Sequence, residues 1–178
     1  MALKGQDVAV VLKLCAAPQR LPYARLAVEL SMSPSEVHAA VKRAQGSRLL
    51  LSGEFNERPN RSAVEEFLIH GLKYAFPAEH GGPTRGVLTS YAAAPLREFF
   101  ASDGELPPVW PYAEGKVRGL ALQPLYERAP EAASRDSLLY EYLVLADALR
   151  DGRSRERKLA AEMLVKRLRS LTYEQPEP

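Results

Sequence analysis

The stretch LPYARLAVELSMSPSEVHAAVKRAQGSRLLL, residues 21–51, decides the fold of this part of the chain. Apolar side chains recur in its first third at the spacing i, i+3, i+4 and i+7: Tyr23, Leu26, Ala27 and Leu30. This spacing predicts a short helix with one apolar face. Ser33, Pro34 and Glu36 then form the pattern of a new helix start, with a capping serine, a proline at the first helical position and a glutamate that closes a capping box.

The second predicted helix has little apolar bulk on its outer side. Its apolar positions are Val37, Ala40, Val41 and Ala44, and they form one face. The other sides carry small, polar and basic residues: Ser35, Glu36, His38, Ala39, Lys42, Arg43 and Gln45. Two short helices joined by a tight turn, with such residues on the second, are the layout of a helix-turn-helix whose second helix enters the DNA major groove.

Residues 26–50, LAVELSMSPSEVHAAVKRAQGSRLL, resemble the bacterial winged helix-turn-helix transcriptional regulators, MarR-like and related groups. The shared pattern has Leu-Ala before the turn, Ser-x-Ser-x-Val at the second helix, and a basic residue before a Leu-Leu strand. Ser31 stands at the turn position where the family usually has glycine, which serine can fill at some strain. The resemblance covers the first third of the chain, and it implies DNA binding with a wing in the loop of residues 53–61.

Candidate contact residues follow from this resemblance and from the chemistry of base edges. Ser33 and Ser35 lie at a helix N-terminus, which favours phosphate or base-edge contacts. In the major groove we expect Glu36 near a cytosine amino group, Ala39 near a thymine methyl group, and Lys42 or Arg43 near guanine or phosphate. His38 is a candidate donor to phosphate or a base edge. The remaining candidates hold the DNA backbone or reach the minor groove from the wing: Arg48, Arg58 and Arg61.

Composition and charge agree with a globular protein that has a polyanionic partner. The chain has 178 residues, of which 46% are hydrophobic and 26% charged. Seven basic residues oppose three acidic ones in residues 1–48, and eight oppose three in residues 150–169, so positive charge gathers near both ends. No apolar run approaches the roughly 20 residues of a membrane span, and no signal-cleavage site follows the N-terminus, so we expect a cytoplasmic protein without membrane contact.

The predicted fold class is mainly α, divided into residues 1–61 (winged helix-turn-helix), 62–135 and 136–178. A first helix over residues 5–17 places Val8, Val11, Leu12 and the lone Cys15 on its inner face. Ser62 is expected to cap a helix that ends near residue 76. Residues 79–135 are Pro- and Gly-rich yet apolar, which predicts an ordered, mostly irregular segment with one helical turn at 96–101 and a short strand at 116–123.

Three roles remain open for the aromatic side chains of residues 79–135. They are plain core, a ligand pocket lined by Trp110, Tyr91 and Tyr112, or a docking surface for another protein. A C-terminal pair of helices follows, the first capped by Ser134 or Asp136 and the second opened by Ser154. The apolar stripe of the last helix predicts packing against an intramolecular neighbour or a second copy.

No catalytic, metal-binding or cofactor-binding pattern stands out. His38, His70 and His80 lack metal-ligand spacing, and neither a phosphate-binding loop nor a nucleophile elbow occurs. We therefore expect a non-enzymatic, homodimeric regulator that binds double-stranded DNA in a sequence-specific way. The alternatives are a protein-interaction module that uses residues 79–135, such as an adaptor or the neutralising partner of a toxin, a small-molecule-sensing regulator, and an RNA-binding protein.

Overall fold

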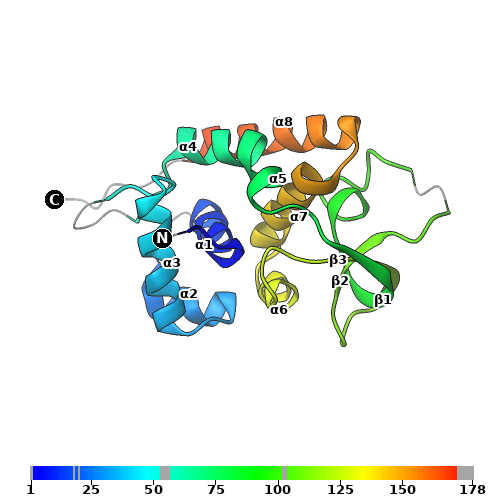
Figure 1. The fold of residues 1–178 in the computed structure, drawn as a ribbon, viewed down its shortest axis with the longest axis horizontal. Coiled ribbons are helices and arrows are strands. Elements are labelled where there is room, and N and C mark those ends of the chain that lie inside the picture. Colours follow the sequence, from blue (N-terminus) through cyan, green and yellow to red (C-terminus); the bar gives the residue numbers. More distant parts are fainter. Residues whose placement is uncertain (1, 18, 20, 53–56, 102–103, 172–178) are drawn as a thin grey trace.

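The computed structural model describes residues 2–17, 19, 21–52, 57–101 and 104–171, which form a mostly helical protein with a small sheet (Figure 1). The elements are, in order, α1 Gly5–Ala16, α2 Tyr23–Leu30, α3 Pro34–Gly46, α4 Arg61–Glu66, a π-helical segment Phe67–Gly71, α5 Leu72–Ala75, β1 His80–Leu88, a 3-10 turn Ser90–Ala92, β2 Pro108–Pro111, β3 Val117–Leu122, α6 Ala129–Arg135, α7 Ser137–Asp151 and α8 Ser154–Ser170. The prediction of a mainly α protein is confirmed.

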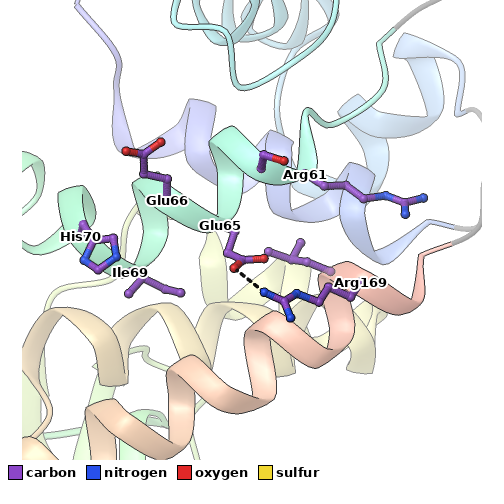
Figure 2. A pocket seen from close by; sticks show the side chains of 8 residues that line it. Arg61, Glu65, Glu66, Ile69, His70 and Arg169 are labelled. Carbon is purple, nitrogen blue, oxygen red and sulfur yellow. Dashed lines mark hydrogen bonds and ion pairs between the residues drawn. The ribbon is translucent and has the colours of Figure 1, made fainter.

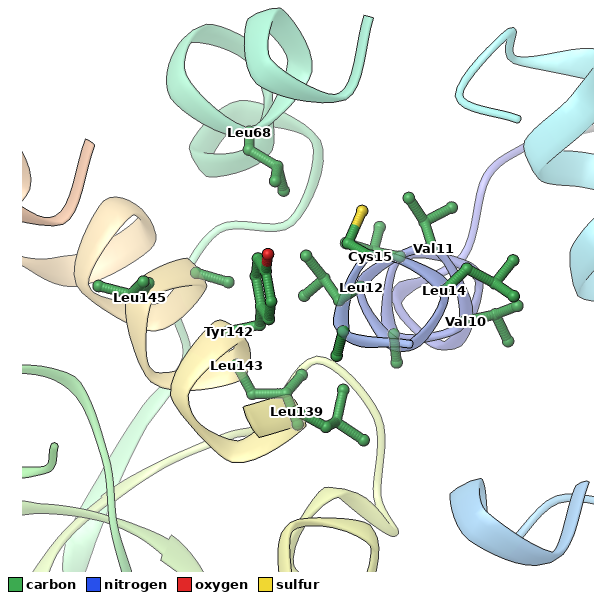
Figure 3. Close-up of a cluster of buried hydrophobic side chains, with 14 of the residues drawn as sticks. Val10, Val11, Leu12, Leu14, Cys15, Leu68, Leu139, Tyr142, Leu143 and Leu145 are labelled. Atoms are coloured by element: carbon green, nitrogen blue, oxygen red, sulfur yellow. The ribbon is translucent and has the colours of Figure 1, made fainter. Parts of the chain in front are cut away.

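Helix α1 lies in the centre of the molecule, with α3 on one side and α7 on the other (Figure 1). Every residue from Asp7 to Ala16 is buried, so the prediction of a single inner face is wrong. The second face is covered because α7 packs against it, and Leu12 and Cys15 lie near Tyr142 and Leu68 in this core (Figure 3). Burial raises the pKa of the Cys15 thiol to about 12.

The turn between α2 and α3 has the backbone that the sequence predicts. Ser31 adopts the left-handed conformation with φ of 54°, a backbone that glycine adopts more readily than serine. Ser33 caps α3, because its hydroxyl accepts a hydrogen bond from the Glu36 amide at 3.2 Å while the Glu36 carboxylate accepts one from the Ser33 amide at 2.7 Å. The predicted start of this helix is confirmed.

A minimal hairpin follows α3. Leu50 pairs with Pro59 in an isolated antiparallel bridge, and the Leu51 amide donates to the Arg58 carbonyl at 2.9 Å. Of the loop predicted at 53–61, residues 53–56 lie outside the described residues. The next helix begins at Arg61 and is capped by Asn60, whose side chain accepts from the Ala63 amide. The predicted cap Ser62 is therefore wrong. Pro59 pairs with Leu50, Asn60 directly after it caps the helix, and Ser62 is already the second helical residue.

Residues 79–135 contain more regular structure than the sequence predicts. Strands β1, β2 and β3 each pair with the other two. β1 runs antiparallel to both β2 and β3, whereas β2 and β3 run parallel to each other. The predicted strand at 116–123 is confirmed as β3, whereas the mostly irregular description is wrong because β1 spans nine residues. The turn predicted at 96–101 is a series of hydrogen-bonded turns rather than a helix.

The two C-terminal helices are present as predicted. Asp136 caps α7, since its carboxylate accepts from the amides of Leu138 and Leu139 at 3.0 Å. The apolar stripe of α8 packs against α7 and α4, so an intramolecular neighbour covers it. Hydrophobic contacts run without interruption from α1 to α8, and one core therefore spans all three predicted segments of the chain.

Candidate nucleic-acid interface

The α3 outer face is the surface formed by Ser35, Glu36, His38, Ala39 and Lys42. Ala39 is half-buried and the other four residues are exposed. They stand opposite the buried face of the same helix, which consists of Val37, Ala40, Val41 and Ala44. Four of its five side chains are exposed and therefore accessible to a partner from outside.

The N-terminal end of α3 is fixed by its capping box. The Glu36 carboxylate is bound by the Ser33 backbone amide and the Ser33 side chain, and these hydrogen bonds lower the pKa of Glu36. Glu36 is thus a carboxylate at neutral pH with one oxygen already engaged. Its other oxygen can accept a hydrogen bond from a ligand such as a cytosine amino group.

Arg43 does not belong to this face, and the expectation that it points outward is wrong. Only 8% of the residue is exposed, and its guanidinium donates two hydrogen bonds to the Asp7 carboxylate, at 2.8 Å from Nε and 2.7 Å from Nη2. Asp7 is fully buried on α1 and also accepts from the Lys4 amide at 2.7 Å. Arg43 therefore joins α3 to α1, which leaves Lys42 as the basic side chain of the outer face.

His38 and Lys42 differ in their freedom to bind. The His38 ring meets the Tyr23 ring edge-on, with 5.7 Å between ring centroids, so α2 steadies its orientation. Within the described part of the chain, Lys42 has neither an ion pair nor a hydrogen-bonded side-chain partner. Lys42 is accordingly an unneutralised positive charge at the C-terminal end of the α3 outer face.

The three other predicted contact residues flank the C-terminal end of α3. Arg48 is exposed and has a left-handed backbone with φ of 60°, directly after the helix. Arg58 lies in the hairpin and Arg61 at the first position of α4, and both are half-buried. The sequence predicts Arg61 in a loop, whereas it forms part of a helix start beside the hairpin.

Two arginines of α6 and the turn before it hold the turn between α2 and α3. Arg135 donates to the Val28 carbonyl and to the Ser31 hydroxyl, both at 2.7 Å, and Arg128 donates to the Ser31 carbonyl. They tie the C-terminal end of α2 to α6 and the turn before it; the Val28 carbonyl also accepts from the Ser31 amide at 3.3 Å. Sequence reasoning missed both, because these contacts join residues about one hundred positions apart.

The aromatic residues of the middle segment do not line one pocket, which corrects that alternative. Trp110 is buried, and its indole donates to Asp147 at 2.6 Å. Tyr112 borders a pocket of about 520 Å³ with Arg85, and Tyr91 borders another of about 660 Å³ with Phe99 and Phe100. The three side chains therefore belong to different surroundings.

Comparison with known proteins gives no family: the chain matches no protein-family model, no curated protein and no solved structure. The described residues include no group of three or more histidine, cysteine, aspartate or glutamate side chains placed to hold a metal ion. Nor does any helix within the described ranges combine the length and apolar character needed to cross a bilayer.

Proposed function

We propose that the protein is a sequence-specific DNA-binding transcriptional regulator of the winged helix-turn-helix type. The observation that carries this proposal is the accessible α3 outer face, preceded by a left-handed turn at Ser31 and followed by a hairpin. In this arrangement α3 enters the major groove with its N-terminal amides toward phosphate, and Lys42 binds guanine or phosphate. Arg48 and the hairpin hold the flanking backbone.

The regulator acts as a homodimer in this proposal. One recognition helix with few base contacts provides too little affinity alone, and two copies about 34 Å apart would read two half-sites on one face of the duplex. Analytical ultracentrifugation without and with duplex DNA measures the stoichiometry. Footprinting then shows whether two protected half-sites are separated by one helical turn.

The test begins with selection of a preferred sequence from random duplexes, followed by fluorescence anisotropy at increasing salt. Lys42→Ala is expected to weaken binding and to reduce the slope of log K against log salt by about 1 for a phosphate contact. Ala39→Glu places a negative charge against the groove and is expected to abolish binding. Lys116→Ala and Ala113→Glu, at exposed positions near the sheet, are the matched controls.

Two results would contradict the proposal. One is no duplex binding at roughly 50 mM salt, where phosphate contacts are strongest. The other is equal affinity of the Lys42→Ala and Lys116→Ala variants for the selected duplex.

A second candidate, a protein-interaction module, has one observation in its favour. Large apolar side chains are exposed within residues 79–135, namely Phe99 at 56%, Leu120 at 42% and Leu106 at 39%. A complex held by such contacts would survive high salt, whereas a DNA complex would dissociate. Binding to a purified protein partner at high salt, abolished in Phe99→Ser and Leu120→Ser, would favour this candidate.

A further inference from the structure

The last helix has two faces of different character. Its inner face, formed by Glu156, Ala160, Leu164 and Leu168, is buried against α7 and α4. The opposite side, here called the α8 outer face, consists of Arg155, Lys158, Glu162, Lys166 and Arg169, all of them exposed. These positions follow one another at spacings of three and four residues, so they form one row along the helix.

The α8 outer face carries four positive charges and one negative charge. Arg155, Lys158 and Lys166 have no ion-pair partner within the described ranges. Glu162 lies four residues from both lysines, yet it pairs with neither of them there. Arg155 with Lys158, and Lys166 with Arg169, are like charges three residues apart, which destabilise an isolated helix, whereas Glu162 stands at the spacing of a favourable pair with each lysine.

Two basic side chains near the C-terminal end of α8, Arg167 and Arg169, pair with acidic residues on other helices. Arg167 pairs with Glu141 of α7 at 2.5 Å. Arg169 pairs with Glu65 of α4 at 3.2 Å (Figure 2), while 72% of its side chain stays exposed. The acidic partners Glu141 and Glu65 therefore both lie near the C-terminal end of α8. Arg155, Lys158 and Lys166, three of the four cations of the row, are exposed and remain accessible to a partner outside the molecule.

We propose that the α8 outer face binds the phosphate backbone of duplex DNA without reading its sequence. From Arg155 to Lys166 the row is about 16 Å long at a rise of 1.5 Å per residue, long enough to contact several phosphates. Because the inner face is buried in the core, the row is held rigid before it binds. It lies along a different side of the molecule from α3 (Figure 1).

This inference extends the proposed function, because the partner is of the same class, but it depends on separate residues. The α8 outer face supplies electrostatic affinity that is equal for all sequences, whereas the α3 outer face supplies the preference among sequences. The two contributions can be removed independently.

The experiment compares two variants of the full chain with the same net charge. The first is Arg155→Gln, Lys158→Gln and Lys166→Gln together, and the second is Arg85→Gln, Arg97→Gln and Arg118→Gln, which are exposed residues outside α8. Glutamine keeps the helix propensity of the replaced residues, and circular dichroism checks that both variants fold. The probe is a 20-base-pair duplex of random sequence, and the affinity is measured by anisotropy over a range of salt.

For the α8 variant we expect the slope of log K against log salt to fall by about 3, because three phosphates are no longer neutralised. For the control variant we expect the slope to fall by less than about 1. Equal reductions in both variants would overturn the inference, since only net charge would then matter. Binding to phosphatidylserine vesicles but to no duplex would overturn it as well. Salt-dependent binding through α8 without any sequence preference would refute the proposed function alone, and sequence-specific binding with equal reductions would refute this inference alone.

Discussion

At the scale of the residue, the ion pair between Asp7 and Arg43 joins α3 to α1 and withdraws Arg43 from the surface that a partner could contact. A buried carboxylate is stable only when it is paired, and Arg43 and the Lys4 amide are the groups that satisfy Asp7. Arg43 and Lys42 are adjacent, yet one joins two helices in the core and the other is exposed to solvent. Substitution of Arg43 should therefore lower the stability of the fold, whereas substitution of Lys42 should weaken DNA binding and leave the stability nearly unchanged.

Arg43→Ala leaves the charge of Asp7 buried and is expected to lower the free energy of unfolding by about 3–5 kcal/mol. Lys42→Ala, the matched control on the surface, should change it by less than about 0.5 kcal/mol. Urea denaturation followed by circular dichroism measures both. If the Arg43→Ala variant were as stable as the Lys42→Ala variant, the buried pair would not join these helices in solution.

The sequence predicts the two faces of α3 only in part, and the pair of Arg43 and Asp7 shows why. Arg43 stands at the border between the apolar positions and the outer face, so periodicity leaves its direction open. Its partner Asp7 lies 36 residues earlier on a helix that the sequence describes as half-exposed. Capping residues such as Ser33, Glu36 and Asp136 were predictable, because their partners lie within a few positions along the chain.

At the scale of the element, the sheet shows where sequence patterns mislead. Gly81, Gly82 and Pro83 belong to β1, although this composition is typical of a loop. β1 contains Gly86 at the point where it pairs with both β2 and β3. A Cβ on Gly86 would lie 2.0 Å from the Trp110 carbonyl oxygen. Glycine therefore permits the closure of the three strands, and no alternation of apolar residues marks it.

Gly86→Ala is accordingly expected to destabilise the protein by about 1–3 kcal/mol, because the new methyl group meets backbone that cannot move without breaking strand pairing. Gly82→Ala, in the same strand, is the control, since its Cβ would meet nothing within 4 Å. Thermal unfolding of the two variants distinguishes them. A Gly86→Ala variant as stable as Gly82→Ala would mean that β1 and β2 are further apart in solution.

At the scale of the whole molecule, two polar clusters, one buried and one partly buried, join elements that are distant in sequence. Asp147 of α7 accepts from Thr89 at 2.7 Å and Trp110 at 2.6 Å and pairs with Arg150 at 2.7 Å, which ties the sheet region to α7. Burial raises the pKa of Asp147, against the opposing effect of Arg150. The second cluster is centred on Lys13 of α1, whose ammonium contacts Glu29 of α2 and Asp136 at the start of α7.

The Lys13 cluster predicts how the stability of the protein depends on pH. Burial acts to raise the pKa of Glu29 and of Asp136. Hydrogen bonds and charge from Lys13, together with Arg25 at Glu29 and the Leu138 and Leu139 amides at Asp136, outweigh it and lower both pKa values below their ordinary 4.5 and 3.8. The folded state therefore binds these protons more weakly than the unfolded state. Their stabilising contribution is complete well above the ordinary pKa values, and it is lost progressively from about pH 5 as the pH falls through the lowered values.

Lys13→Met removes the ammonium while keeping the length of the side chain. We expect the variant to be less stable than the unsubstituted protein at pH 7, and the difference in unfolding free energy to shrink between about pH 5 and pH 3. Glu36 has a lowered pKa in both proteins, so its effect cancels in the difference. Urea denaturation at each pH measures the two curves, and parallel curves would show that Lys13 does not join α1, α2 and α7 through these carboxylates.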